Sequence, residues 1–376
     1  MPIRILHTAD NHIGLPYKHY NEQVRDTLVT ERFDALARLV ETANSRKADF
    51  FVVAGDLFDS IRVPVRDVRK TAGILKGFSG VAVIVVPGNH DHYAGPATEV
   101  WKRFREEIEG AGTIDLLTSA DVKTYEAEGQ RVHFFPCPCP SKTGQDSTIG
   151  WVADAAREKT DGLRIGIAHG NVTGLGLDAE GRYFNMDPAA LEHAGVAAWL
   201  LGHIHVPFPT ADTGERSPYF MAGTHTPNSL RCRHAGSAWW IECEGDRVSR
   251  HERLSPGRIR FVRIDRQLTS ADDVAAVLAE CRGHEPARTV LDLQLSGRLS
   301  AADRVTLDES IAGLRPGFLH ISDESDIHDR IDAAQIAATY SDQGLAARLL
   351  TALLNDAARP DAATLAHELI EEARKP

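Results

Sequence analysis

Five short segments of the sequence carry histidine, aspartate or asparagine side chains at spacings that suit metal binding. In chain order they are Asp10-Asn11-His12, Gly55-Asp56-Leu57-Phe58-Asp59, Gly88-Asn89-His90-Asp91, His169-Gly170 and Gly202-His203-Ile204-His205. Imidazoles, carboxylates and an amide oxygen are ligands for manganese, iron, zinc or nickel, whereas a calcium site would use oxygens alone. One such segment is a weak signal, because a lone histidine after a strand is more often an ordinary core or surface residue. Five of them in one chain predict a metal centre.

Each segment follows directly on an apolar stretch of strand length. These stretches are Ile3–Thr8, Phe50–Ala54, Val81–Val86, Leu163–Ala168 and Ala197–Leu201. The carboxyl ends of strands in layered α/β folds open onto loops where ligands bind, so side chains after five strands can converge on one point. Glycines precede Asp56, Asn89 and His203, and they allow the tight turns that would aim these side chains at a metal.

Helical patterns alternate with the strands through the first 205 residues, which indicates an α/β architecture. The clearest helices are Glu31–Ala43, Asp67–Phe78 and Glu99–Ile108, and a further strand is Arg131–Phe135. After His205 come four short stretches that predict antiparallel strands of a second sheet. They are Tyr219–Ala222, Ala238–Cys243, Arg247–Arg253 and Arg258–Ile264.

The sequence predicts three parts. Residues 1–265 form the α/β domain, and residues 266–325 alternate helix and strand, as in a small α+β domain. Residues 326–376 are rich in Ala and Leu at helical spacing, which predicts a C-terminal helical segment.

Composition narrows the class of protein. Hydrophobic residues make up 43% and charged residues 25%, as in a soluble globular chain. Apolar runs such as Val81–Val86 are far shorter than the about 20 residues that cross a bilayer, and the N-terminus lacks an export pattern. We therefore expect a cytoplasmic protein with no membrane association. The five cysteines are odd in number and scattered, which predicts reduced thiols.

The net charge of −11 argues against a protein that coats nucleic acid by bulk electrostatics. Arginines are nevertheless concentrated between Arg231 and Arg266. This arginine-rich segment is either a solvated strand face or a contact for the phosphate backbone of a nucleic acid. The candidates for phosphate contact are Arg231, Arg233, Arg258 and Arg260.

The five segments together resemble the signature of the calcineurin-like metallophosphoesterases, which runs DxH, GDxxD, GNHD, H and GHxH. The resemblance implies a four-layer β-sandwich flanked by helices, with two divalent metal ions, for which manganese is our first choice. One metal would be held by Asp10, His12, Asp56 and His205, and the other by Asp56, Asn89, His169 and His203. Asp56 would bridge the two ions, which together would activate a water for in-line attack on phosphorus.

The same resemblance implies roles for the remaining motif residues. His90 would contact the phosphate and assist the leaving oxygen as a general acid or charge stabiliser, and Asp91 would orient His90. Asp59 would either tune a ligand from behind or cap its loop.

The substrate is suggested by a closer resemblance. Ala9-Asp10-Asn11-His12-Ile13-Gly14, an arginine-containing helix and Gly55-Asp56-Leu57-Phe58-Asp59 look like the SbcD family of DNA repair exonucleases. Protein phosphatases of this fold carry GDxVDRG and GNHE instead, and small cyclic-nucleotide enzymes usually end soon after GHxH.

The SbcD resemblance implies a capping domain, a DNA substrate, an SMC-like ATPase partner of the SbcC type bound through C-terminal helices, and a homodimer. Some relatives carry His in place of Asp59, so an endonuclease role tied to that histidine does not carry over. Two alternatives remain: a small-molecule phosphodiesterase or nucleotide hydrolase using the same metals, and a metal-bound scaffold that recruits the ATPase to DNA ends.

Overall fold

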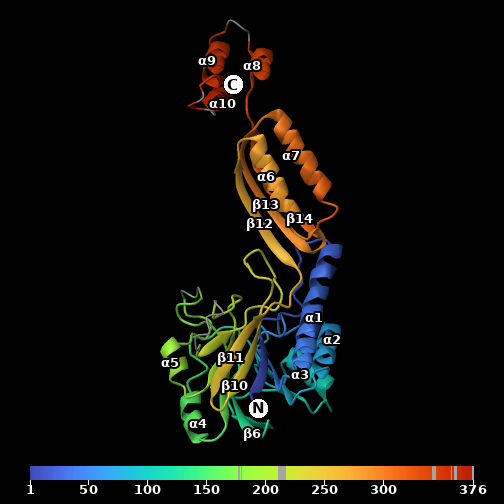
Figure 1. Cartoon of the computed structure of the whole chain (residues 1–376), viewed down its shortest axis with the longest axis vertical. Helices are drawn as coiled ribbons and strands as arrows, with labels where there is room; N and C mark the ends of the chain where they lie inside the picture. Colours follow the sequence, from blue (N-terminus) through green and yellow to red (C-terminus); the bar gives the residue numbers. More distant parts are fainter. Residues whose placement is uncertain are drawn as a thin grey trace. The chain divides into compact units, whose positions relative to one another are not determined.

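The computed structural model describes residues 1–376 apart from residues 177, 179, 211–216, 341–343, 357, 360–361 and 375–376. The chain forms two compact units, Met1–Arg260 and Phe261–Pro376 (Figure 1). This division lies close to the boundary that the sequence predicts after residue 265. The further boundary after residue 325 stays a prediction.

The first unit contains two sheets. The larger has the strand order β11-β10-β1-β2-β3-β4. Its strands are β1 (Ile3–Thr8), β2 (Phe50–Ala54), β3 (Ala82–Val86), β4 (Ile114–Leu116), β10 (Ala238–Glu244) and β11 (Arg247–Leu254). Strands β1 to β4 are parallel, while β10 is antiparallel to β1 and to β11.

The smaller sheet has the order β5-β6-β7-β8-β9. Its strands are β5 (Lys123–Ala127), β6 (Gln130–Cys137), β7 (Leu163–His169), β8 (Ala198–Gly202) and β9 (Tyr219–Met221). Strands β6 to β9 are parallel and β5 is antiparallel to β6. The carboxyl ends of β7 and β8 therefore lie at one edge of this sheet, as those of β1, β2 and β3 do in the larger one.

Successive side chains of a strand point to opposite faces of its sheet. Each sheet therefore packs against the other sheet on one face and against helices on the other. In β2, Phe50 and Val52 belong to the core between the sheets, whereas Phe51 and Val53 pack against the outer helices. The helices on the larger sheet are α1 (Glu22–Ser45), α2 (Val65–Lys76) and α3 (Glu99–Ile108), and those on the smaller sheet are α4 (Val152–Glu158) and α5 (Pro188–Glu192). Figure 1 shows the two groups on opposite sides of the unit. This confirms the predicted four-layer fold.

The prediction of a separate second sheet after His205 is wrong. The stretch Tyr219–Met221 extends the smaller sheet as a parallel edge strand, and Ala238–Glu244 and Arg247–Leu254 extend the larger sheet beside β1. The fourth stretch, β12 (Arg260–Leu268), belongs to a third sheet. Pairing with strands that come earlier in the chain decides which sheet these strands join, a tertiary effect that local pattern does not contain.

The second unit contains the third sheet and six helices among its described residues. The sheet comprises β12, β13 (Thr289–Leu299), β14 (His320–Asp323) and β15 (Asp326–Asp329), and α6 (Ala271–Arg282), a 3-10 turn (Pro286–Arg288) and α7 (Ala301–Leu314) accompany it. Ser270 and Ser300 begin α6 and α7 as N-caps, accepting backbone N–H groups. The C-terminal helices α8 (Ala333–Thr339), α9 (Leu345–Leu354) and α10 (Ala362–Arg374) share a small core of their own.

Two further expectations concern chemistry and membranes. All five cysteines are free and buried. Within the described part of the chain, every helix is too short or too polar to cross a bilayer.

Candidate metal centre

Loops after five strand ends of the first unit meet at one point, as predicted. Three groups of side chains there have candidate ligand atoms that all lie within 4.8 Å of one another. The groups are Asp10, His12 and His205; His12, Asp56 and His90; and Asp10, Asp56 and His169.

The His169 ring faces three oxygen atoms, one at Nδ1 and two at Nε2. Its Nδ1 lies 2.9 Å from the carbonyl oxygen of Ala54, which only accepts, so Nδ1 carries the hydrogen. Its Nε2 then lies 3.0 Å from Asn89 Oδ1 and 3.3 Å from Asp56 Oδ2. A cation has to lie among these three atoms, either a proton on Nε2 or a metal ion.

Asn89 is held so that its oxygen faces two histidines. Its Nδ2 donates to the carbonyl oxygen of Lys142 (3.3 Å), and its Oδ1 lies 3.1 Å from Nδ1 of His203. The same oxygen contacts His169. Asn89, His169, His203 and Asp56 thus lie together in one half of the centre. They are the residues that the resemblance implies for the second metal ion.

The other half lies around His12 and His205, whose Nε2 atoms are 3.1 Å apart. Asp10 Oδ1 lies 3.7 Å from the Nε2 of His205, and Asp56 Oδ2 lies 3.7 Å from the Nε2 of His12. Asp56 therefore lies against both halves. Two imidazole nitrogens and two carboxylates pointing at one another fit a shared divalent cation.

Four of these residues have left-handed backbone conformations that are rare outside glycine. The φ angles are 50° at Asp10, 41° at His12, 52° at Asp56 and 99° at His203. Each such residue costs about 1–3 kcal/mol and persists only where the surroundings enforce it. The chain is strained where its candidate ligands lie.

The glycines before the ligands are needed for close approach more than for turns. Only Gly55, at φ 86°, is left-handed. A Cβ on Gly88 would lie 2.2 Å from Asp56 Oδ1, and one on Gly202 would lie 2.2 Å from the carbonyl oxygen of Ala54. These glycines let neighbouring ligand loops touch.

Burial keeps most of the histidines neutral. It lowers the pKa of His203 to about 3 and lowers the pKa of His12 and His205 below the usual range. For His169, burial alone would lower the pKa, but the neighbouring Asp56 carboxylate outweighs it and raises the pKa to about 9. A divalent cation bound there would take the place of that proton, since metal ligands bind deprotonated.

His90 lies in the centre, and its ring is oriented by a main-chain group. Its Nδ1 lies 3.0 Å from the carbonyl oxygen of Asp59, and its backbone N–H donates to Asp56 Oδ1 (2.8 Å). The Asp59 carboxylate itself lies 3.3 Å from Nδ1 of His12, which favours tuning of a ligand over loop capping.

The predicted orientation of His90 by Asp91 is wrong. The buried Asp91 carboxylate accepts the backbone N–H groups of Gly88 (2.7 Å) and Phe58 (3.0 Å). It thereby joins two ligand loops, and the Asp59 carbonyl orients His90.

Sequence reasoning missed three side chains that support the ligands. Asn228 places its amide 3.3 Å from Nδ1 of His205, the ring of Tyr183 lies 4.9 Å from that of His203, and Arg32 donates to the carbonyl of His12. None of them belongs to a motif, and each comes from a segment distant in sequence from the residue it contacts, so only the fold could reveal them.

The four candidate arginines are all exposed, and they do not form one cluster. Arg231 and Arg233 lie on the loop between Asn228 and His234, whose side chains contact Nδ1 and the carbonyl of His205. This loop places two exposed arginines close in sequence to a ligand contact.

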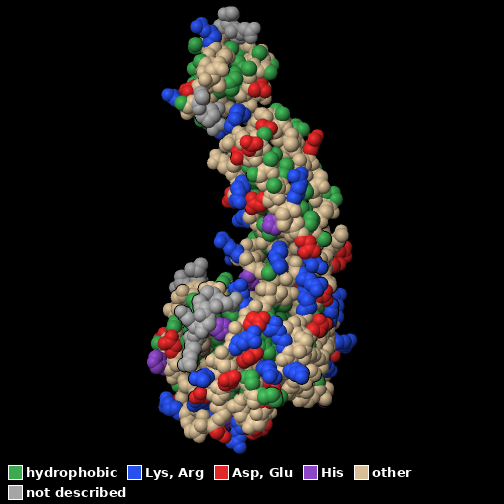
Figure 2. Space-filling view, in the orientation of Figure 1, with side chains coloured by type: hydrophobic (Ala, Val, Ile, Leu, Met, Phe, Trp, Pro, Cys, Tyr) green, Lys and Arg blue, Asp and Glu red, His purple; other side chains and the backbone are tan. Residues whose placement is uncertain are grey.

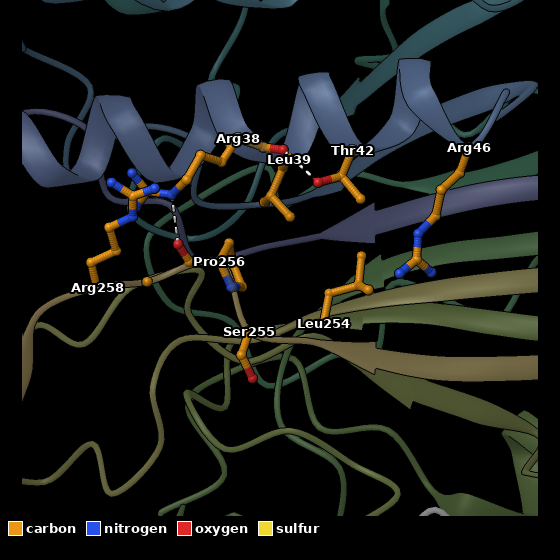
Figure 3. A pocket seen from close by; sticks show the side chains of 9 residues that line it. Arg38, Leu39, Thr42, Arg46, Leu254, Ser255, Pro256 and Arg258 are labelled. Carbon is orange, nitrogen blue, oxygen red and sulfur yellow. Dashed lines mark hydrogen bonds between the residues drawn. The ribbon is translucent and has the colours of Figure 1, made fainter.

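Arg258 lies elsewhere, against α1. With Arg38 and Arg46 it lines a cavity of about 370 Å³. In Figure 3 the side chains of Arg38 and Arg258 point toward the same end of this cavity, and Arg46 lies at the other. Arg38 and Arg46 are paired with Glu31 and Glu252. Arg260 donates to the carbonyls of Gly257 and Ile259.

Other arginines of the segment are neutralised. Arg250 pairs with Glu252 (3.2 Å), Arg263 with Asp292 (2.7 Å) and Arg266 with Glu280 (3.0 Å). Figure 2 shows basic and acidic side chains interspersed on the visible face.

Residues 3–207 match the family model described as calcineurin-like phosphoesterase. The chain belongs to this family. The family indicates a metal-dependent phosphoesterase, and the donor set above fits its divalent cations.

Curated relatives have modest identity. The chain is 27% identical over 274 residues to the uncharacterized metallophosphoesterase YhaO of Bacillus subtilis, covering 65% of this chain and 63% of that protein. It is 26% identical over 266 residues to the DNA double-strand break repair protein Mre11 of Aeropyrum pernix, covering 65% and 58%. The matches thus span less than two thirds of these relatives. The crystal structure of TT1561 of Thermus thermophilus aligns with a TM-score of 0.40 at 14% identity, covering 63% of this chain and 94% of that one.

Proposed function

We propose that this protein is a two-metal DNA nuclease that hydrolyses phosphodiester bonds in DNA repair, as an exonuclease that also acts on ends or hairpins. The observation that carries the proposal is the convergence of the DxH, GDxxD, GNHD, H and GHxH residues on one buried point. The likeness to a DNA double-strand break repair protein supports DNA as the substrate.

We assign one metal ion to each half of the centre. Asp10, His12, Asp56 and His205 would hold one cation, and Asp56, Asn89, His169 and His203 the other. When bound, two such ions supply an activated water and stabilise charge on the phosphate and leaving oxygen. Manganese remains our first choice.

His90 is the residue we assign to proton transfer. Because the Asp59 carbonyl can only accept, Nδ1 of His90 carries a hydrogen and Nε2 is the atom left to face the substrate. From that position a protonated His90 would donate to the leaving oxygen or stabilise its charge. Asp91 would act indirectly, by holding the Gly88 and Phe58 loops together.

The DNA contacts we propose are phosphate contacts. Arg231 and Arg233 are the better candidates, because they are exposed and close in sequence to the residues that touch His205. Arg258 would contact the backbone further away, beside the cavity on α1. Arg260 is the weaker candidate, since its guanidinium already donates to two carbonyls.

Exposed apolar side chains in the second unit support the proposal of a protein partner. Helices α9 and α10 expose large apolar side chains: Leu345 (84%), Leu349 (45%), Leu365 (48%) and Leu369 (67%). Exposed leucines on neighbouring helices are typical of an interaction face. We propose that this face binds an SMC-like ATPase of the SbcC type, and that the protein works as a homodimer.

The test is hydrolysis by the purified protein with Mn²⁺, using labelled single-stranded, duplex and hairpin DNA beside a small phosphodiester. Assays run with and without the ATPase, and Asp56→Ala serves as the metal-deficient control. We expect DNA degradation that requires Mn²⁺ and is lost in Asp56→Ala.

Cleavage of the small phosphodiester alone would overturn the nuclease proposal and favour the small-molecule alternative. Failure to hydrolyse any substrate, in a protein that still binds the ATPase and DNA ends, would favour the scaffold.

A further inference from the structure

Arg32, on α1, is a buried cation beside the metal centre. Its side chain is among the largest fully buried ones in the described structure, at 1% exposure. Within the part of the chain that the structure describes, no carboxylate forms an ion pair with it at 4.0 Å or less. Burying a guanidinium without a carboxylate is costly, so such a residue usually has a specific task.

Arg32 donates to neutral oxygens, two of which are carbonyls of the Asp10-Asn11-His12 loop. Its Nε donates to the carbonyls of Asn11 (2.8 Å) and His12 (3.1 Å). One terminal nitrogen donates to the hydroxyl of Tyr17 (2.9 Å). One N–H group, shared between two consecutive carbonyls of this loop, therefore holds both on the same side.

Drawing the carbonyls inward fixes the direction of the ligands. Asp10 and His12 are both left-handed, at φ 50° and 41°, a conformation that relaxes unless something holds it. With the carbonyls of Asn11 and His12 tied to Arg32, the loop holds this unfavourable conformation and keeps both ligand side chains aimed at His205 and Asp56.

The same guanidinium reaches the segment that supports His205. Its second terminal nitrogen lies 3.4 Å from Oγ1 of Thr224, and Thr224 pairs with Ala9 in an isolated bridge. Four residues further on, Asn228 contacts Nδ1 of His205. Arg32 thus connects the Asp10-Asn11-His12 loop with the segment that supports His205.

We propose that Arg32 is a positioning residue that sets the affinity of the Asp10, His12 and His205 half of the centre for its metal, leaving the Asn89 half unaffected. The inference rests on the ligand sets of the proposed function. Groups that orient metal ligands from behind typically change metal affinity by about 10–100-fold when removed.

The test is titration calorimetry of metal-free protein with Mn²⁺, comparing wild type, Arg32→Met and Arg32→Lys. Arg25→Met is the control, because Arg25 lies on the same helix but is far less buried. We expect one of two Mn²⁺ sites to weaken by about tenfold or more in both Arg32 variants. In nuclease assays the Mn²⁺ requirement should rise while the rate at saturating Mn²⁺ stays near wild type.

Melting of each metal-free variant, followed by circular dichroism, separates folding from binding. A folded Arg32→Met protein with two wild-type Mn²⁺ affinities would overturn the inference. If Arg32→Met does not fold, Arg32→Lys decides. It keeps the charge but lacks the Nε–H group that holds the Asn11 and His12 carbonyls, so wild-type Mn²⁺ affinities in Arg32→Lys would contradict the inference. Wild-type protein that binds no Mn²⁺ pair would instead refute the proposed function.

Discussion

The metal centre and the arginine-rich segment are both built from polar side chains, but they differ in what holds them. In the centre, residues such as Asp10 and His169 are fully buried and lie within about 3–4 Å of partners distant in sequence. In the segment, arginines close in sequence are exposed and separately placed, Arg263 against Asp292 and Arg258 against the α1 cavity. The side chains of the centre converge because the carboxyl ends of parallel strands lie at one edge of a sheet. The arginines of the segment are close only in sequence, and no such arrangement brings them together.

This contrast implies that a substitution in the centre acts on chemistry and on folding together, whereas one in the segment acts on substrate affinity alone. Four experiments test this difference between the two regions.

Replacing His90 by Gln should have the largest effect. Gln keeps a donor near the Asp59 carbonyl but cannot transfer a proton, so we expect turnover to fall by about 10²–10⁴-fold. Metal content, measured by mass spectrometry, should stay at the wild-type value. The control variant His92→Gln, in the same loop, should lose far less turnover. Unchanged hydrolysis by His90→Gln would remove His90 from the reaction.

Acid should destabilise the first unit through His7, which joins the two sheets below the centre. Its Nε2 contacts the carbonyls of Leu201 and Phe220 (both 3.1 Å), and burial lowers its pKa from 6.5 to about 4. Below pH 6.5 the unfolded chain binds a proton that the folded chain refuses, so stability falls as pH falls. The difference corresponds to about 3 kcal/mol by pH 4.

Urea unfolding of metal-free protein between about pH 7 and pH 4 measures this slope. His7→Gln, which can donate but does not titrate, should reduce this slope, while the exposed His19→Gln should leave it unchanged. An identical slope in His7→Gln would assign the acid sensitivity to other groups.

Replacing Gly202 by Ala should destabilise the protein and disturb the centre. The added Cβ would lie 2.2 Å from the Ala54 carbonyl oxygen and 2.7 Å from Nδ1 of His169, and such overpacking costs about 1–3 kcal/mol. We expect a lower melting temperature and weaker Mn²⁺ binding.

The matched control is Gly73→Ala in α2, where a Cβ meets nothing within 4 Å. That variant should melt at or above the wild-type temperature, because Ala favours helix. A Gly202→Ala protein that behaves like Gly73→Ala would show that the ligand loops can move apart.

The smallest effect is expected for the exposed arginines. In Arg231→Ala/Arg233→Ala, losing two phosphate contacts should reduce the slope of log K against log salt by about 2, with little change in stability. Arg250→Ala, whose arginine is paired with Glu252, should keep the wild-type slope. The salt dependence of DNA binding is measured by fluorescence anisotropy. An equal reduction of the slope in both variants would contradict the proposal that the loop with Arg231 and Arg233 contacts DNA.

Much of the fold was predictable because it is locally encoded. The apolar runs of β1 and β2 and the periodic helix α3 coincide with their predicted bounds. The strand β15 was not recognised, because Asp326–Asp329 is acidic and becomes a strand only by pairing with β13. Helix α1 begins at Glu22. The apolar spacing predicts a start only at Glu31, because the first turns of this helix are mostly polar.

The candidate ligands could be named from sequence because each lies at or shortly after the carboxyl end of a strand. The side chains that support these ligands could not be predicted in this way. Asp91 looks like a partner of its neighbour His90, yet its carboxylate turns to backbone amides. Arg32 and Asn228 contact the ligand loops across long separations in sequence, and no spacing rule connects them.

The left-handed backbone at four candidate ligands has a consequence for the evolution and engineering of this chain. Glycine adopts such angles more readily than aspartate or histidine, so Asp10→Gly or His203→Gly relieves local strain while removing a ligand. A search for thermostable variants that ignored activity would tend to select such changes. Resistance to unfolding and the capacity to bind metal therefore oppose each other at these positions, and only selection for metal binding keeps the strained residues in place.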